Sequence, residues 1–254
     1  MSMTAPAIHT RNLYRQFGET RAVDGLNLSV EAGCFYGLLG PNGAGKSTTV
    51  GMLTGTLLPS GGRIELLGRK LSKNDPWFRA RMGVVPEEPA LFSRLTGLEQ
   101  LVFTGRMFGL GKPESNRRAN ELLKLLQLDG DARTLSADYS RGMRKKLAIG
   151  CALIHAPGLL FFDEPFEGVD ALSADTIRRV LTGLTGRGAT VLLTTHILEV
   201  AEKICQRVGI ICRGKLAEEI DMPELRNSGE NLDERFRRVV GEDRDRPELP
   251  EWLK

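Results

Sequence analysis

A glycine-rich segment is the feature of this sequence that most constrains its fold. It matches the pattern G-x-x-x-x-G-K-[ST] and, with the next residue, consists of Gly40, Pro41, Asn42, Gly43, Ala44, Gly45, Lys46, Ser47 and Thr48. The glycines allow the backbone to curve until several N–H groups point at one anion, Lys46 brings a positive charge to the outer phosphates, and the Ser47 hydroxyl can bind Mg²⁺. This segment, called the phosphate loop below, therefore predicts a nucleoside triphosphate site.

The flanking residues favour this interpretation over a glycine-rich turn without a ligand. The apolar residues 34–39 predict a buried strand, and residues 48–53 predict a helix whose N-terminus faces the phosphates. A strand, a phosphate loop and a helix in this order indicate the α/β core of a P-loop NTPase, with a mixed and mainly parallel sheet.

The residues before and just after this core predict further strands. Residues 7–39 contain period-two stretches such as residues 22–30, which predict an antiparallel β layer near the N-terminus. Beyond the loop helix, we expect a turn at residues 60–62 and strands at residues 63–67 and 82–85.

The middle of the chain changes period. Apolar residues follow helical spacing from about residue 96 to residue 154, and Pro113 is placed to open a helix. This predicts a helical subdomain, about residues 88–157, inserted between core strands. The apolar residues 159–163 and 190–195 end in polar side chains, as expected of parallel strands that are buried on both faces and carry functional groups at their C-terminal ends.

These segments suggest how the chain is divided. We expect a nucleotide-binding domain over residues 1–220, because the predicted core strands and the inserted helices all fall within it. Residues 221–254 are charged and poor in apolar side chains, and predict one helix near residues 232–240 followed by a loose tail through Pro247 and Pro250.

Charge, cysteine spacing and hydropathy exclude several classes of protein. The net charge is only +3 and the charges are interspersed, so nucleic acid is not expected as a partner. The four cysteines form no C-x-x-C pair, which indicates reduced thiols of a cytosolic protein rather than a metal–thiolate site. The N-terminus lacks the features of a signal peptide, and no apolar run reaches about 18 residues. We therefore expect a chain that neither crosses a membrane nor is secreted.

Acidic and imidazole side chains follow two of the predicted strands. Asp163 can hold Mg²⁺ through water from the end of its strand, and Glu164 can polarise the attacking water. The alternative is a strand end that is acidic without a catalytic reason. His196 follows the next strand, where a neutral imidazole can bond the γ-phosphate or the water, although a lone histidine is more often structural.

Further motifs complete a resemblance to one family. They are residues 139–143 (YSRGM, in place of the signature LSGGQ and called the signature segment below), residues 161–165, the turn at residues 168–170, and Thr195-His196. Together with the phosphate loop, and in this order over residues 8–220, they resemble the ATP-binding cassette (ABC) ATPases that drive membrane transport.

The resemblance implies a site shared between two subunits. In the family, two cassettes enclose two ATP molecules head to tail, so Ser140 and the Gly142 backbone would contact the γ-phosphate bound by the other subunit. Asp170 would lie where the two subunits meet. Phe17 resembles the aromatic residue that stacks on adenine; a strand-core role for Phe17, with Tyr14 stacking instead, is the alternative.

Two positions depart from the family pattern. Glu87 replaces the usual glutamine that senses Mg²⁺ and communicates with the membrane partner, and its charge would be repelled near the γ-phosphate but attracted next to Mg²⁺. Arg141 replaces the first glycine of the signature; its side chain either is solvated or reaches phosphate across the dimer.

The function implied by the resemblance is that of an ATP-binding and ATP-hydrolysing subunit, using ATP and Mg²⁺, which powers an exporter by ATP-driven dimerisation. It would work with a separately encoded transmembrane permease and with a second copy of itself or a homologous ATPase subunit. Its location would be cytoplasmic, peripheral to the inner face of the cell membrane. One alternative is a soluble ABC-type ATPase acting on nucleic acid or the ribosome. The other is an unrelated kinase or GTPase, although the sequence has no N-K-x-D guanine motif.

Overall fold

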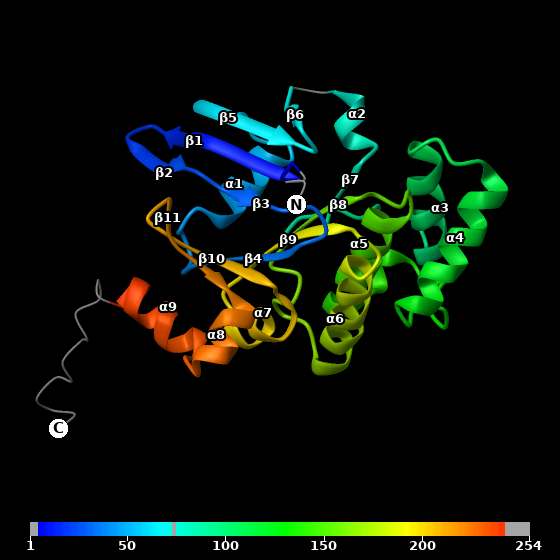
Figure 1. Ribbon diagram of the computed structural model, residues 1–254. Coiled ribbons are helices and arrows are strands. Elements are labelled where there is room, and N and C mark those ends of the chain that lie inside the picture. Colours follow the sequence, from blue (N-terminus) through cyan, green and yellow to red (C-terminus); the bar gives the residue numbers. More distant parts are fainter. Residues whose placement is uncertain (1–4, 73–74, 242–254) are drawn as a thin grey trace, which may run out of the picture.

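A mostly parallel sheet forms the centre of the computed structural model, which describes residues 5–72 and 75–241 (Figure 1). Its strands follow the order β11-β10-β4-β9-β8-β7, and only β11 is antiparallel to its neighbour. Their bounds are β4 Phe35–Leu39, β7 Met82–Val85, β8 Leu159–Asp163, β9 Thr190–Thr195, β10 Arg207–Cys212 and β11 Lys215–Asp221.

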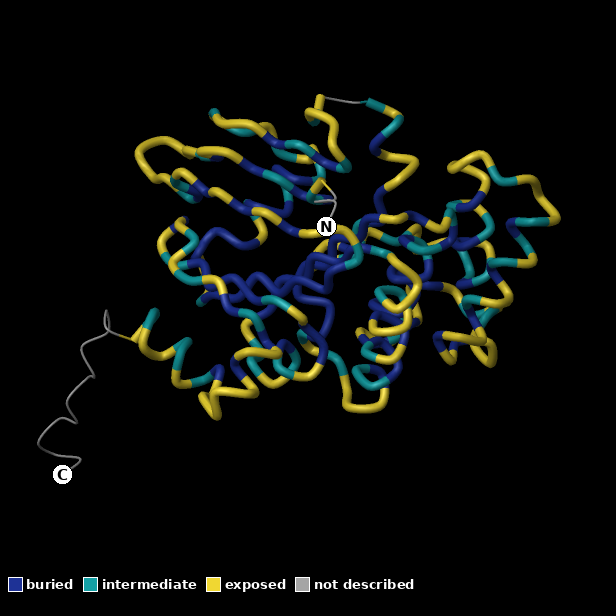
Figure 2. The backbone as a smooth tube through the Cα atoms, viewed as in Figure 1, coloured by how far each residue is buried: buried dark blue, intermediate teal, exposed yellow. Residues whose placement is uncertain are grey.

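Every residue of β4, β8 and β9 is buried, which explains why these strands are continuous apolar runs (Figure 2). Consecutive side chains of a strand point to opposite faces of the sheet and so pack in different hydrophobic clusters. Phe162 belongs to the cluster under α5, α6 and α7, whereas Phe161 packs on the opposite face with α1 and the second sheet. Burying each such side chain contributes roughly 1.5–3 kcal/mol, so both faces hold the three strands in place.

The second sheet is antiparallel and lies across α1 (Lys46–Leu53) from the central sheet (Figure 1). It has the order β2-β1-β5-β6, and β3 also pairs with β1. Its strands are β1 Ile8–Phe17, β2 Thr20–Leu26, β3 Ser29–Val30, β5 Gly61–Leu66 and β6 Arg69–Lys70. The expected antiparallel layer is confirmed, and the chain completes it with two strands that come after the phosphate loop.

The turn predicted at residues 60–62 is wrong in its extent, because Gly61 and Gly62 already belong to β5. Glycine is needed at Gly61 for packing rather than for turning: a Cβ there would lie 2.2 Å from a ring carbon of Tyr14. The predicted end of the strand is also late, because Leu67 lies in the turn that follows, with a φ of 51°.

Helices occupy the part of the chain where helical periodicity predicts them. α3, α4 and α5 group at one end of the sheet, and Figure 1 shows α3 and α4 as the outermost layer there. The extent of a helical subdomain over residues 88–157 stays a prediction. The helices beyond α1 are α2 Pro76–Arg79, α3 Gly97–Met107, α4 Lys112–Leu125, α5 Arg141–Leu153, α6 Ala171–Thr185, α7 Leu198–Ile204, α8 Met222–Ser228 and α9 Leu232–Gly241.

Local sequence explains several helix boundaries. Thr96 and Glu99 form a reciprocal capping box that starts α3, and Pro113 lies in the first turn of α4, where its missing N–H costs nothing. The helix expected near residues 232–240 is present as α9, but the prediction of one helix in this segment is wrong, because Asp221 caps a second helix, α8, whose first turn contains a proline. The tail expected through Pro247 and Pro250 lies outside the described residues.

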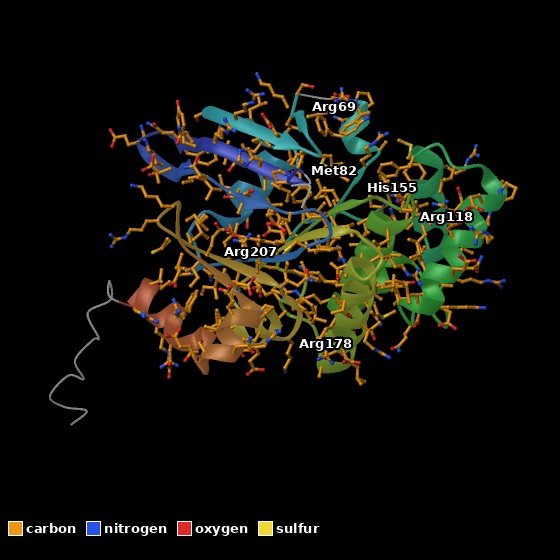
Figure 3. All side chains as sticks on the ribbon, in the orientation of Figure 1. Arg69, Met82, Arg118, His155, Arg178 and Arg207 are labelled. Carbon is orange, nitrogen blue, oxygen red and sulfur yellow. The ribbon has the colours of Figure 1, made fainter. Side chains whose placement is uncertain are left out.

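The residues around His155, just after α5, join the helical group to the central sheet (Figure 3). The Nε2 of His155 bonds the Met82 carbonyl of β7 at 3.0 Å, and its ring stacks on Phe108 at 3.7 Å. From α4, Arg118 donates to the Ile154 carbonyl at 2.9 Å. The link between helices and sheet is therefore partly polar.

Candidate nucleotide site

The phosphate loop joins the end of β4 to the start of α1, and its glycines are required by close contacts. A Cβ at Gly40 would lie 2.4 Å from the Ile211 carbonyl oxygen, and one at Gly45, whose φ is 106°, would lie 2.4 Å from the Ala22 carbonyl oxygen. Larger residues would therefore open the loop. The loop leaves the N-terminus of α1 facing the cavity, where the helix dipole favours an anion.

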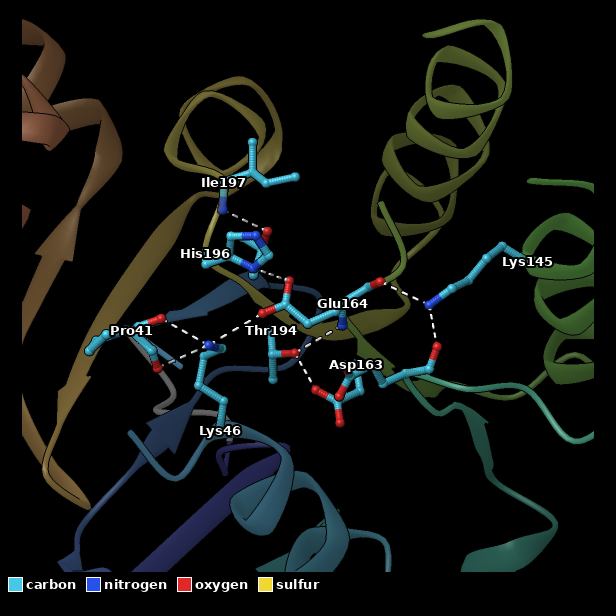
Figure 4. A network of polar contacts seen from close by, with 11 residues as sticks. Pro41, Lys46, Lys145, Asp163, Glu164, Thr194, His196 and Ile197 are labelled. Atoms are coloured by element: carbon cyan, nitrogen blue, oxygen red, sulfur yellow. Dashed lines mark hydrogen bonds and ion pairs between the residues drawn. The ribbon is translucent and has the colours of Figure 1, made fainter. Parts of the chain in front are cut away.

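Lys46 is held at the centre of the loop with a side chain only 6% exposed. Its ammonium donates to the carbonyls of Gly40 at 2.8 Å and Pro41 at 3.3 Å, and lies 3.3 Å from Oε1 of Glu164 (Figure 4). The three acceptors surround a cation that an incoming phosphate can attract in their place. Gly40, Pro41 and Ala44 belong to the loop but do not line the cavity described below.

The ends of β8 and β9 are tied together by one hydroxyl. Asp163 and Thr194 are opposite each other in the parallel register, and the Thr194 hydroxyl donates to Oδ1 of Asp163 and accepts from the Glu164 N–H at 3.0 Å. Thr194 is fully buried. The sequence motifs do not indicate a role for Thr194, because that role depends on β8 and β9 being neighbours in the sheet.

Glu164 lies between a cation and an imidazole. Its Oε2 is 3.1 Å from Nδ1 of His196, while Oε1 faces Lys46, and the residue is 4% exposed. The backbone of Glu164 has a φ of 44°, which is uncommon for a side chain of this kind and is found at functional sites. The structure thus brings Lys46, Glu164 and His196, which are far apart in the sequence, into one bonded group.

Lys46 and Glu164 line a cavity of about 480 Å³, within the size range of small-molecule sites. Phe17 is one of its walls and is 47% exposed, so the strand-core interpretation of Phe17 is wrong. Tyr14, the competing aromatic residue, packs instead over Gly61 in the second sheet. The cavity is lined by Phe17, Ala22, Asn42, Gly43, Gly45, Lys46, Ser47, Thr48, Glu87, Glu164 and Glu167.

Carboxylates gather on one side of this cavity. Burial raises the pKa of Glu87, and the nearby charges of Asp163, Glu167 and Glu164 raise it further, against a smaller opposite effect of Lys145. A cation placed among these groups would favour their charged forms. Glu167 lies outside the sequence motifs, and it reaches the cavity because its N–H bonds the Glu164 carbonyl at 3.2 Å in a tight turn.

The donor set fits Mg²⁺ bound together with phosphate. The Ser47 hydroxyl and the Glu87 carboxylate line the cavity, and Asp163 lies behind it, 6% exposed. Within residues 5–72 and 75–241, no group of three or more His, Cys, Asp or Glu side chains forms a metal site by itself. Mg²⁺ usually takes one or two carboxylates and completes its shell with water and substrate phosphates.

The signature segment lies outside this cavity. Ser140 is the N-cap of α5 and accepts from the Met143 N–H at 3.2 Å, while a Cβ at Gly142 would lie 2.9 Å from Oδ2 of Asp170. Arg141 is exposed, and its side chain packs on Gly168 of the same chain. A Cβ added to Gly168 would lie 2.3 Å from a guanidinium nitrogen of Arg141. The structure therefore does not bring Ser140 and Gly142 to the phosphate loop of their own chain.

The fold and site define a class of protein. A glycine-rich loop before a helix, a buried lysine and an acidic pair at a neighbouring strand end are the parts of a P-loop nucleoside triphosphatase. Within the described part of the chain, no helix has both the length and the apolar character needed to cross a bilayer.

Comparison with known proteins places the chain within this class. Residues 23–167 match the family model described as ABC transporter. The daunorubicin/doxorubicin resistance ATP-binding protein of Streptomyces peucetius is 41% identical over 89% of this chain and 69% of its own length. A Nod factor export ATP-binding protein of Cupriavidus metallidurans is 40% identical over 85% of this chain and 71% of its own length. The chain belongs to the ABC transporter family, as one of its ATP-binding, ATP-hydrolysing cassettes.

A solved structure agrees. A dimeric ATP-binding cassette in a post-hydrolysis state, bound to ADP and Pi, is similar with a TM-score of 0.78 and 25% identity, over 85% of this chain and 98% of that one. The interpretation as an unrelated kinase or GTPase is therefore wrong.

Proposed function

We propose that this cassette powers an exporter together with a separately encoded transmembrane permease and a second cassette, either another copy of itself or a homologue. Its relatives are named for drug resistance and for Nod factor export, which supports outward transport. Its place would be cytoplasmic, at the inner face of the membrane, held there by the permease. The observation that carries the catalytic part is the Glu164 carboxylate, held between Lys46 and His196 at the border of the cavity.

The contacts suggest how hydrolysis is prepared. The γ-phosphate would draw the Lys46 ammonium away from the carbonyls of Gly40 and Pro41 and from Oε1 of Glu164. Glu164 is then free to accept a proton from the attacking water, while His196 fixes the orientation of its carboxylate. Phe17, exposed at the rim and stacked under the Arg15 guanidinium at 4.5 Å, would cover the adenine.

Ser47, Glu87 and Asp163 are the residues that would hold Mg²⁺. The ion would neutralise charge on the outer phosphates. Glu87, whose pKa is raised by burial and by the neighbouring carboxylates, would lose that penalty beside a cation. The phosphate loop, from Gly40 to Thr48, would enclose the phosphates and bind them through the N–H groups of its cavity-lining residues.

Ser140 and Gly142 would act on the ATP of the second cassette. They lie at the N-terminus of α5, whose dipole favours an anion, and outside the cavity of their own chain. A second cassette placed head to tail would bring its phosphates to this helix end.

A pair of exposed aromatic rings marks where the permease would dock. Phe92 and Phe103 meet edge to face with centroids 5.2 Å apart, and both are more than two-fifths exposed. Phe92 lies in the segment that follows Glu87, so an apolar helix of the permease packed there would contact the segment that carries the metal-facing carboxylate.

The proposal is tested by co-purifying the cassette with a candidate permease and measuring ATP-driven substrate uptake into inverted membrane vesicles. We expect uptake with the unmodified cassette and none with Glu164→Gln. Glu199→Gln, which removes an acid 83% exposed on α7, is the matched control and should support normal uptake. ATP hydrolysis that never drives uptake with any permease would contradict the transport role.

A further inference from the structure

Lys145 is a buried cation that the roles described so far do not use. It lies on α5, five residues after Ser140, and is only 3% exposed. Its ammonium donates to two main-chain carbonyls, that of Glu164 at 3.0 Å and that of Glu87 (Figure 4). One side chain therefore bonds the backbone of two segments at the site, the end of β8 and the loop after β7.

The contacts are made to the backbone, so they leave the carboxylates of both residues available to the cavity. Glu164 is bonded from opposite sides: its carbonyl accepts from Lys145 while its carboxylate faces Lys46 and His196. The uncommon φ of Glu164 is thus held by bonds at both ends of the residue. Removing the ammonium would take a donor from the Glu87 carbonyl and leave the Glu164 carbonyl with the Glu167 N–H as its remaining donor, which would loosen the backbone on which the carboxylate is carried.

The surroundings of Lys145 match this role. Burial lowers the pKa of Lys145, the carboxylates of Glu167, Glu87 and Asp163 counteract that effect, and Arg141 adds to it. The acidic side of the cavity therefore supports an ammonium that its burial disfavours. Lys145 does not line the cavity itself, so contact with the nucleotide does not explain its position.

We propose that Lys145 is a positioning residue that joins the first turns of α5, the loop at Glu87 and the end of β8 at Glu164 into one unit. The start of α5, which carries Ser140, then moves together with the backbone of the water-activating carboxylate. Engagement of Ser140 by the second cassette's ATP is in this way transmitted to Glu164 and to the loop of Glu87. This inference rests on the role proposed for Glu164.

A neighbouring lysine provides a matched control. Lys146 is also buried on α5, but its ammonium contacts the Gln127 carbonyl at 3.4 Å in the segment after α4. Both substitutions to methionine remove a buried ammonium from the same helix and keep a flexible side chain of similar length. Only the Lys145 substitution removes a bond to Glu164 and Glu87.

The first test is steady-state ATP hydrolysis by the full chain, with thermal unfolding measured in parallel. Lys145→Met should lower kcat about 10- to 100-fold, the usual loss when a supporting side chain is removed, and change KM for ATP by less than about threefold. Lys146→Met should keep kcat within about threefold of the unmodified protein at a similar loss of thermal stability. Lys145→Arg, which keeps a cationic donor, should recover part of the lost kcat and serves as the variant of choice if Lys145→Met does not fold.

The second test is a double-variant comparison in single-turnover assays with radiolabelled ATP. If Lys145 acts through Glu164, adding Lys145→Met to Glu164→Gln should cost little further activity. A normal kcat in Lys145→Met, or an equal extra loss in both backgrounds, would overturn this inference and leave the role of Glu164 intact. Full turnover by Glu164→Gln would instead overturn the proposed catalytic role, and this inference with it.

Discussion

The two parts of the nucleotide machinery differ in what a single chain supplies. Around the phosphate loop, Lys46, Glu164 and His196 are bonded to one another beside a cavity, so this part is complete within one chain. The signature segment presents a helix end outside that cavity, where Ser140 caps α5 and Gly142 packs beside Asp170. We infer that one copy can bind ATP but that hydrolysis needs a second.

The largest effect should follow from removing the water-activating carboxylate. Glu164→Gln should lower turnover by about two to four orders of magnitude, the usual contribution of a positioned acid or base, because an amide cannot accept the proton. ATP binding should persist and an ATP-loaded dimer should accumulate. Steady-state hydrolysis and binding of a fluorescent nucleotide would measure the two effects; near-normal turnover would contradict the role given to Glu164.

A substitution in the signature segment should separate binding from pairing. Ser140→Arg places bulk and charge at the start of α5, so it should abolish ATP-driven dimerisation while ATP still binds at the phosphate loop. Sedimentation in the Glu164→Gln background, where dimers should accumulate, gives the clearest signal. Ser228→Arg, an exposed serine at the end of α8, is the control and should dimerise normally. Dimers of Ser140→Arg that form as readily as the parent's would refute the shared site.

A smaller effect is expected at Glu87, which lines the cavity and precedes the segment that carries Phe92. Glu87→Gln is nearly isosteric and should keep ATP hydrolysis within about threefold of the unmodified rate. Glu87→Ala should lower the amount transported per ATP, because the loop then has no side chain that contacts the metal. The ratio of uptake to hydrolysis in vesicles is the quantity to follow. An unchanged ratio in Glu87→Ala would mean that coupling runs elsewhere.

The smallest effect concerns His155, remote from both parts of the site. Burial lowers the pKa of His155, and the charge of Arg118 lowers it further, against the opposing bond to the Met82 carbonyl. Because the folded pKa lies below the unfolded one, this contribution to stability is complete above the unfolded pKa of about 6.5 and is lost as pH falls through the folded value. The free energy of unfolding, measured with denaturant, should therefore fall more for the unmodified protein than for His155→Gln when the pH is lowered from about 7.5 to about 5.5. Equal weakening would show that His155 is not responsible.

The sequence predicted most residues of the site but not how they are connected. Lys46, Asp163 and Glu164 stand in motifs whose spacing indicates their chemistry. No motif indicates the roles of Thr194 and Lys145, because their contacts depend on which strands become neighbours and on where α5 packs against the sheet. Both contacts join residues at least nineteen positions apart in the sequence.

The secondary structure likewise divides into elements that local sequence predicts and boundaries that depend on tertiary contacts. Buried strands and amphipathic helices follow from periodicity, so β8, β9 and α9 lie close to where they were expected. The start of β5 was missed because Gly61 accommodates the Tyr14 ring from another strand, and glycine otherwise favours a turn. A side chain 47 positions away, rather than local preference, therefore determines what that glycine does.

The most direct test of the shared site mixes two inactive variants. Lys46→Ala should lose nucleotide binding at its own phosphate loop but keep an intact signature segment. Ser140→Arg should keep nucleotide binding but have a defective signature segment. In an equal mixture, half of the random pairings join the two variants and each such pair has one intact site of two, so hydrolysis should recover to at most about a quarter of the unmodified rate. Activity no greater than the sum of the two variants assayed alone would contradict the claim that each ATP is bound by one copy and completed by another.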